Sequence, residues 1–340
     1  MTALLLARRA GQATTIQDLG RTGHQRFGVP VGGALDTTSL RLANAVVGNA
    51  LDAAGLEFRL VGPELVVEAD SVRVAFGGGV EATIGNDPPR IVSPWRGVTL
   101  ARGQVLRMRV VAGAMGYLAV AGGLAIEPVL GSRSTYVRAG FGGLEGRALE
   151  DGDRLPLVAA RAEGDDQVLS PPGPESGPLH VIMGPQDEAF TDQAIETFLG
   201  VAFTVGREAD RMGVRLDGPC LAHRTDANIV SDGIASGAIQ VPANGQPIVL
   251  LADRQTVGGY TKVATVISAD LPRAGQLKPG DDVRFEAVTV ERAIELRRGA
   301  EADLARRIAG IGPAPPIELD EDALFGGNLI SGVVDAADLG

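Results

Sequence analysis

Cysteine and histidine are scarce in this chain of 340 residues. The single cysteine, Cys220, excludes a disulfide framework and any metal site built from several thiolates. The histidines, His24, His180 and His223, form no His-x-x-x-His pair, so we expect no metal centre held by histidines. No cationic or histidine neighbour lies closer to Cys220 than His223, and we interpret this cysteine as a buried small apolar residue.

Long apolar runs are missing as well. No segment approaches the roughly 18 consecutive apolar residues that a membrane span needs, and the apolar run that follows Met1 is too short for a signal peptide. A single cysteine fits a reducing compartment. These features together predict a cytoplasmic protein that has no membrane partner.

Basic residues are outnumbered by acidic ones. The chain has 31 Lys and Arg against 42 Asp and Glu, which gives a net charge of -11. Such a field repels a phosphate backbone, so we expect no nucleic-acid partner, and an anionic substrate would need a local cationic pocket. The chain also contains no Walker-type phosphate-binding loop.

Turn-forming residues, by contrast, are abundant, with 47 glycines and 20 prolines. From residue 56 onward, short apolar segments alternate with turns at a spacing typical of a barrel or sandwich. We therefore expect a mainly β protein with a few helices. A first hairpin is expected from segments 4–7 and 13–16, and Gly77–Gly79 is expected to mark a barrel corner between strands 72–76 and 80–84.

The order of these segments predicts two β-barrel subdomains joined by a linker. Asp36 is the expected N-cap of a helix inserted in the first subdomain, and Gly48 is expected to follow the end of that helix. The predicted divisions are a first barrel over 1–160, a Pro/Gly/Ser-rich linker over 161–178, a second barrel over 179–288, a helix over 289–311 and an acidic flexible tail over 312–340.

A polar loop over residues 253–262 lies between two apolar segments, 248–252 and 263–267, that each predict a buried strand. The loop contains a carboxylate, two cations, an amide, hydroxyls and a phenol, beside a Gly-Gly pair that lets backbone N–H groups approach a ligand. This composition predicts a surface that binds an anion or a carbonyl group. The alternative is a polar hairpin with an internal Asp–Arg pair.

Several collinear motifs resemble those of one protein family. They are Gln17–Arg21, Gly28–Pro30, Asp36–Asn44, Asp210–Gly213 and Gly237–Leu271. With them the chain resembles the biotin-dependent carboxyltransferase-like family, also called allophanate hydrolase subunit 2-like, and within it the branch formed by the C subunits of 5-oxoprolinases. The resemblance runs from about residue 14 to residue 286. It implies cyclophilin-like β-barrels, in agreement with the strand pattern.

The resemblance to this branch implies a hetero-oligomer. Such a chain acts with proteins that resemble the B and A subunits of a 5-oxoprolinase, which opens 5-oxoproline to glutamate with ATP, and the ATP, with magnesium, is shared with a partner chain. A second branch implies a carboxyltransferase that uses carboxybiotin, although this chain has no Met-Lys-Met biotin site. A third implies a Kip antagonist-like regulator without catalysis.

Four residues are candidates for catalysis: Lys262, Arg254, Asp253 and Asp232. Lys262 and Arg254 are expected to neutralise charge that develops on a phosphoryl or carboxyl group. Asp232 or Asp253 is expected to orient a substrate N–H, or to act as a base if burial raises its pKa. Asp232 stands where relatives often carry glutamate, and Thr261 stands where they commonly carry proline.

Further residues are candidates for substrate binding. Gly258 and Gly259 are expected to supply amide donors, and Tyr260 is expected to close one wall of the site. For each charged residue, the alternative is an internal ion pair. The other members of this set are Gln255, Thr256, Gln240, Asp210, Arg211, Asp18 and Arg21.

Overall fold

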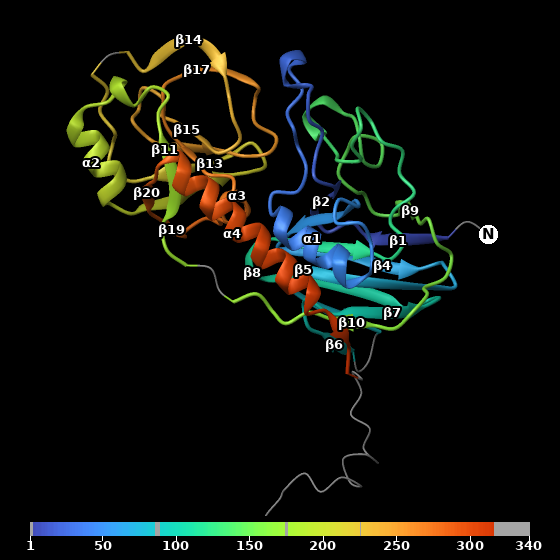
Figure 1. The fold of residues 1–340 in the computed structure, drawn as a ribbon. Helices are drawn as coiled ribbons and strands as arrows, with labels where there is room; N and C mark the ends of the chain where they lie inside the picture. Colours follow the sequence, from blue (N-terminus) through green and yellow to red (C-terminus); the bar gives the residue numbers. More distant parts are fainter. Residues whose placement is uncertain (1–2, 86–88, 174–175, 225, 316–340) are drawn as a thin grey trace, which may run out of the picture.

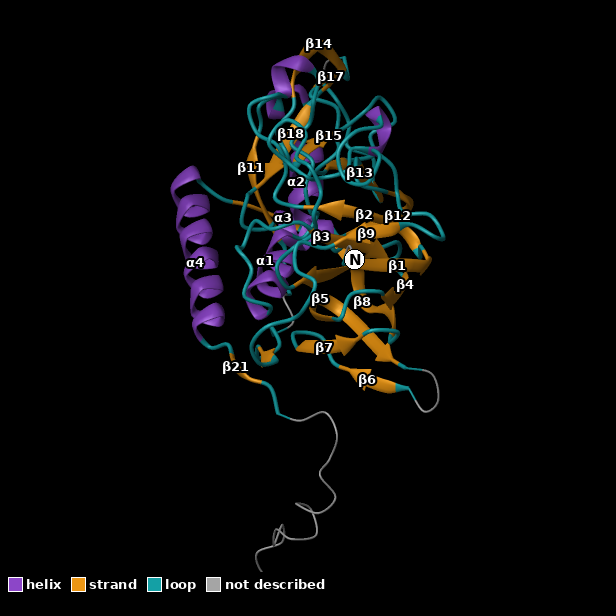
Figure 2. Cartoon of the chain, turned by 90° about the vertical axis from the view of Figure 1, so that its right-hand side faces the viewer, coloured by secondary structure: helices purple, strands orange, loops and turns teal. Residues whose placement is uncertain are grey.

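The computed structural model describes residues 3–85, 89–173, 176–224 and 226–315, and in this part of the chain most elements are strands. Figures 1 and 2 show two β-rich halves, with the helix near the C-terminus lying along one side of both. The expectation of a mainly β protein with two barrel-like subdomains is confirmed. No helix in the described part of the chain is both long and apolar enough to cross a membrane.

The first half is a large antiparallel sheet that curls around an apolar core. Its path runs β2-β3-β8-β4-β1-β9, and β5 joins it through β8 and also pairs with β6 and β7. Leu5, Phe58, Phe76 and Leu118 are among the fully buried side chains of this core. The strands are β1 (Leu4–Arg9), β2 (Gln12–Gln17), β3 (Gly55–Arg59), β4 (Val61–Val67), β5 (Ser71–Ile84), β6 (Arg90–Val92), β7 (Gly97–Ala101), β8 (Val105–Val120) and β9 (Arg154–Pro156).

The second half is a nearly closed barrel. Its strand order is β19-β12-β13-β16-β15-β18-β11-β20, and the end strands β19 and β20 are separated in the chain by Arg284 alone. Phe198, Phe203 and Phe285 fill its core, with the rings of Phe198 and Phe285 stacked 4.6 Å apart. The strands are β11 (Leu179–Met183), β12 (Phe203–Ala209), β13 (Gly213–Asp217), β15 (Ala238–Gln240), β16 (Ile248–Leu250), β18 (Lys262–Val266), β19 (Asp282–Val283) and β20 (Phe285–Ala287).

Helices and two small ribbons complete the described chain. Asp36 caps the first helix as predicted, since its carboxylate accepts a hydrogen bond of 2.9 Å from the backbone of Ser39. Arg41 of that helix forms an ion pair of 2.9 Å with Glu301 of the last helix. The helices are α1 (Thr37–Val46), α2 (Asp192–Gly200), α3 (Leu271–Gly275) and α4 (Val290–Ala309), with short 3-10 turns η1 (Gln25–Phe27), η2 (Val137–Ala139) and η3 (Asp187–Ala189); the ribbons pair β14 (Asn228–Gly233) with β17 (Val257–Tyr260) and β10 (Gln167–Val168) with β21 (Gly312–Pro313).

Three local expectations were wrong. The segments 4–7 and 13–16 form no hairpin, because β1 pairs with β4 and β9 whereas β2 pairs with β3. Cys220 is exposed rather than buried, because it lies in the irregular segment after β13. The glycine triplet is no barrel corner but lies within the continuous strand β5.

The glycine triplet forms a β-bulge within β5 and lies in close contact with the backbones of α1 and β8. The register between β5 and β8 shifts on both sides of Gly79, and Gly78 has a positive φ of 77°. A Cβ on Gly77 would lie 2.4 Å from the carbonyl oxygen of Ser39, and one on Gly79 would lie 2.3 Å from that of Ala112. Glycine therefore allows α1 and β8 to approach this strand. The predicted acidic tail lies, from residue 316 onward, outside the described residues.

Candidate functional site

The predicted site residues form two separate groups, and the first lies where the two halves meet. The guanidinium of Arg211 donates to the Asp253 carboxylate at 2.8 and 3.0 Å, pairs with Glu57 of β3 and donates to the carbonyl oxygen of Gly33 at 2.7 Å. Burial opposes the charge of Arg211, but the carboxylates of Glu57 and Asp253 outweigh it and raise its pKa above the usual value. This arrangement is the internal ion pair that the sequence left open as the alternative.

Asp18 and Arg21 belong to the same buried region. The Asp18 carboxylate accepts hydrogen bonds of 2.6 Å from the Ser132 hydroxyl and from the backbone N–H of Arg133. Arg21 donates to the carbonyl oxygen of Ser134, and burial lowers its pKa although Asp18 and Asp253 act against this. Both residues thus hold the loop around Ser132 and Ser134 in place.

The second group gathers under the β14–β17 ribbon, which lies over one end of the barrel, far from β6 (Figures 1 and 2). Lys262 is 2% exposed, and its ammonium group binds the half-exposed Asp232 carboxylate at 2.8 Å. The hydrogen bond from Lys262 lowers the pKa of Asp232. The amide oxygen of Gln186 accepts from the backbone N–H of Lys262 at 3.1 Å. The ribbon is therefore fastened to the barrel through a charged pair.

Gln240 lies beside this pair and provides an unused donor. It is the cross-strand partner of Lys262, so both side chains leave the same face of the sheet. The Gln240 side-chain oxygen accepts from Gln255 at 3.3 Å, whereas its Nε2 is buried and has no hydrogen-bond partner among the described residues. A Cβ on Gly258 would lie 2.8 Å from this Nε2, so a side chain at this position would displace the amide.

An open cavity of about 530 Å³ lies beside the ribbon and contains several predicted residues. Gln240, Gln255, Tyr260 and Asp210 line it, together with residues from β12 and β13. Lys262 and Asp232 do not line the cavity. Lys262 is adjacent to the lining residue Gln240, and Asp232 belongs to the ribbon, whose Tyr260 lines the cavity. The cavity combines amide donors and acceptors with charged groups and one aromatic wall, a lining suited to a small polar ligand.

Arg254 and Thr256 hold the base of the ribbon. Arg254 is 1% exposed and donates to the carbonyl oxygens of Ile234 at 3.2 Å and Leu251 at 3.3 Å, and it has no carboxylate partner within the described ranges. Burial lowers its pKa. The carbonyl oxygen of Thr256 accepts from the backbone of Ile234 at 3.0 Å. The catalytic role predicted for Arg254 stays a prediction, because its guanidinium does not line the cavity.

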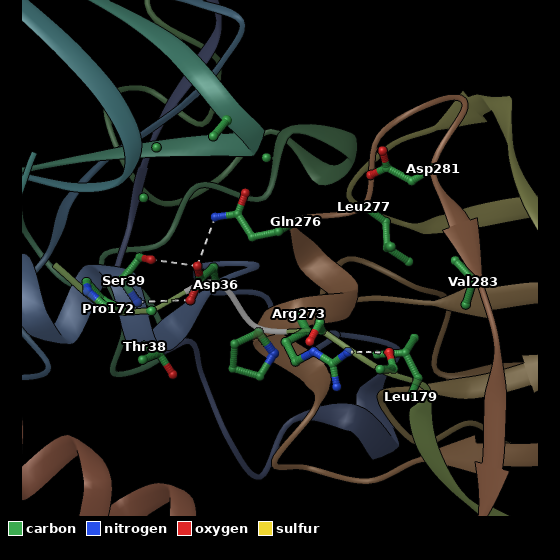
Figure 3. Close-up of a pocket in the computed structure, with 18 of the residues that line it drawn as sticks. Asp36, Thr38, Ser39, Pro172, Leu179, Arg273, Gln276, Leu277, Asp281 and Val283 are labelled. Carbon is green, nitrogen blue, oxygen red and sulfur yellow. Dashed lines mark hydrogen bonds between the residues drawn. The ribbon is translucent and has the colours of Figure 1, made fainter.

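A larger cavity of about 640 Å³ lies between α1, the β5–β8 bulge and α3, and Figure 3 shows it. None of the predicted site residues lines it. The Asp36 carboxylate in its wall accepts from Ser39 at 2.6 Å and from Gln276 at 2.8 Å, and Arg273 donates to the carbonyl oxygen of Gly177 at 2.7 Å. The polar groups of this larger cavity are therefore used to join the two halves. Because the predicted residues line the cavity beside the ribbon instead, we take that cavity as the candidate site.

Sequence reasoning missed two residues that organise these groups, Glu57 and Gln186. Glu57 could have been found because it places a charge inside the apolar strand segment 56–61, and a charge in such a segment needs a partner. Gln186 follows Gly184-Pro185 and carries no such signal. Across the described residues, no three His, Cys, Asp or Glu side chains are grouped so that they would hold a metal ion.

Known proteins match most of this chain. The profile of one family, the carboxyltransferase domain, subdomain A and B, matches residues 27–287. The chain is 38% identical over 296 residues to the C subunit of 5-oxoprolinase from Escherichia coli (strain K12), a match that covers 85% of this chain and 93% of that protein. It is 31% identical over 326 residues to urea amidolyase of Lachancea kluyveri, which covers 86% of this chain and 17% of the enzyme.

Among solved structures, the fold is similar to the urea amidolyase of K. lactis. The TM-score is 0.82 and the sequence identity 29%, over 94% of this chain and 20% of that one. The chain therefore spans about a fifth of that enzyme.

Proposed function

The chain belongs to the family of carboxyltransferase domains with subdomains A and B, and on that premise we propose that it is one component of an ATP-dependent 5-oxoprolinase. The nearly end-to-end match with the C subunit of 5-oxoprolinase supports this, because the same chain corresponds to only 17% of a urea amidolyase. The observation that carries the proposal is the buried, unpartnered Nε2 of Gln240 in the wall of the cavity. Such a donor suits the oxygen of a lactam amide.

The partners in this proposal are proteins that resemble the B and A subunits of a 5-oxoprolinase. The relative is named as one subunit of its enzyme, which supports a complex of several chains. The ribbon offers Val230, Val257 and Tyr260 as exposed apolar side chains next to the cavity, so a partner that docks there would exclude water from it.

The reaction requires that an unreactive lactam be opened. ATP, when bound, supplies the phosphoryl group that turns the amide oxygen into a leaving group. In this chain, Gln240 binds the amide oxygen, Gln255 fixes the orientation of the Gln240 amide, and Tyr260 closes one wall. Asp232 does not line the cavity and its pKa is lowered by Lys262, so it holds Lys262 beside Gln240 and does not act as a base.

We assign the ATP and its magnesium ion mainly to a partner chain. A triphosphate needs several unpaired cations or backbone donors. The Lys262 ammonium is paired with Asp232, and Arg254 is turned toward two carbonyl oxygens. These residues fit a small amide better than a nucleotide.

A second candidate is the carboxyltransferase of a urea carboxylase, which the structural similarity to urea amidolyase favours. In that case a biotin carrier would be supplied by another protein, and the same cavity would take urea. Gln240 would then donate to the urea oxygen.

The test is reconstitution. We would co-express the chain with genomic neighbours that encode the A-type and B-type proteins and measure 5-oxoproline-dependent release of ADP and glutamate. We expect release only from the three-chain complex. Gln240→Met removes the amide while it keeps the volume and should lower kcat/KM about 100-fold, and Lys262→Ala should lower it as well. Gln193→Met, on the exposed face of α2, is the control and should change little.

Two results would count against the proposal. If the complex forms but yields no glutamate, while a biotin carrier supports carboxyl transfer to urea, the second candidate is correct. If glutamate is released and Gln240→Met is as active as the unchanged chain, the reaction stands and the site lies elsewhere.

A further inference from the structure

Arg207 is an unpaired cation in the wall of the candidate site. It lies on β12 and lines the same cavity as Gln240 and Gln255. Within the described ranges its guanidinium has neither a hydrogen bond nor an ion pair, whereas its neighbour Arg215 binds Glu208 at 2.6 Å. In a chain whose net charge is -11, a guanidinium without a carboxylate partner is available to an anionic ligand.

A β-bulge places this side chain in the cavity. The register between β12 and β13 shifts between Val205 and Ala209, so Gly206, Arg207 and Glu208 stand opposite the single residue Arg215. A bulge bends its strand and changes the direction of the side chains in it. Arg207, Glu208 and Arg215 all line the cavity, and the Glu208 carboxylate forms its ion pair with Arg215.

We infer that Arg207 binds a carboxylate on the substrate, so that the cavity selects small amides that carry a carboxylate group. The inference rests on the proposed function and narrows it. Gln240 provides the donor for the amide oxygen, and Arg207 provides the planar fork of N–H groups that matches a carboxylate. 5-Oxoproline has both groups. Urea has no carboxylate and would leave Arg207 unused.

The experiment compares two lactams in the three-chain complex. 2-Pyrrolidinone has the ring and amide of 5-oxoproline but no carboxylate. We expect Arg207→Gln to raise the KM for 5-oxoproline about 10- to 100-fold with little change in kcat, since a hydrogen bond to a charged group is lost. The turnover and binding of 2-pyrrolidinone should not change. Arg298→Gln replaces another exposed arginine, on α4, and is the control.

The outcomes separate this inference from the proposed function. An unchanged KM for 5-oxoproline in an active complex overturns the role of Arg207 alone, as does an equal loss for both lactams. If the complex has no oxoprolinase activity, the proposed function fails, and calorimetric binding of the two lactams decides the inference. The inference is supported if the Arg207→Gln complex binds 5-oxoproline more weakly than the unchanged complex does but binds 2-pyrrolidinone as well. It is overturned if the two complexes bind 5-oxoproline equally, or if the unchanged complex does not bind it.

Discussion

Gly258 shows how a residue without a side chain controls the side chain beside it. A Cβ at this position would lie 2.6 Å from the Ile234 side chain and 2.8 Å from the Gln240 amide nitrogen, distances that real side chains do not show. The next glycine, Gly259, has more room, since its Cβ would lie 3.3 Å from the carbonyl oxygen of Ile229. The two positions of one Gly-Gly pair therefore differ in what they tolerate.

This difference gives a prediction for single residues. Gly258→Ala should displace the ends of the Ile234 and Gln240 side chains and lower the free energy of unfolding by about 1 kcal/mol, the lower end of the usual cost of overpacking, because both ends are flexible. Gly259→Ala should change it by less than about 0.5 kcal/mol. Urea denaturation of both variants measures the difference. Equal stability of the two variants would contradict the contact between Gly258 and Gln240.

At the scale of elements, the β14–β17 ribbon depends on the barrel beneath it. In the described chain its two strands pair only with each other, and a two-stranded ribbon alone has marginal stability. The Lys262–Asp232 pair and the Gln255–Gln240 hydrogen bond attach it to β15 and β18. The ribbon thus forms one side of the candidate site and is held by the polar residues of that site.

The charged pair gives a prediction for the ribbon. Asp232→Asn should make the backbone amides of residues 257–260 exchange with solvent several-fold faster, while the amides of β11 keep their protection. Hydrogen exchange followed by mass spectrometry measures this. Asp52→Asn is the matched control, because Asp52 is exposed and lies between α1 and β3 in the first half.

The pH dependence of the ribbon follows from the direction of the Asp232 shift. The pKa of Asp232 is lowered from 3.8, so the stabilisation is fully present above that value and is lost as the pH falls through the lowered pKa. Protection of residues 257–260, corrected for the intrinsic exchange rate, should therefore stay constant between about pH 5 and pH 8. A steady loss of protection across that range would contradict the pair.

At the scale of the whole molecule, Arg211 joins the two halves. It pairs with Asp253 of the second half and with Glu57 of the first, and these partners are separated from it by 42 and 154 positions in the chain. Tyr117 extends the network, since its hydroxyl donates to Glu57 at 2.7 Å. Removal of the guanidinium would leave two buried carboxylates without their cation.

Arg211→Met should therefore lower the free energy of unfolding by about 3–5 kcal/mol. Arg215→Met, which breaks an exposed ion pair with Glu208, should cost at most about 1 kcal/mol. Urea denaturation of both variants, followed by fluorescence and circular dichroism, makes the comparison. Similar costs would mean that the junction depends on its apolar contacts and not on this network.

The sequence by itself determined the family, the mainly β class and local features such as the Asp36 cap and the strands that flank residues 253–262. Each of these depends on neighbours within a few positions: the alternation of apolar and polar residues, a capping side chain, or a motif. The glycine triplet shows the limit of this reasoning. Whether it turned the chain or bent a continuous strand depended on Ser39 and Ala112, which are remote in the chain.

Only the tertiary structure decided which polar side chains meet. Asp253 and Lys262 stand at the two ends of the segment predicted as one loop, yet Asp253 faces Arg211 at the junction and Lys262, the first residue of β18, faces Asp232 under the ribbon. Strand register places Gln240 beside Lys262, and a bulge places Arg207 in the cavity with Gln240. The physical reason is that the direction of a buried polar side chain is set by the partner that compensates its desolvation, and these partners come from distant parts of the chain.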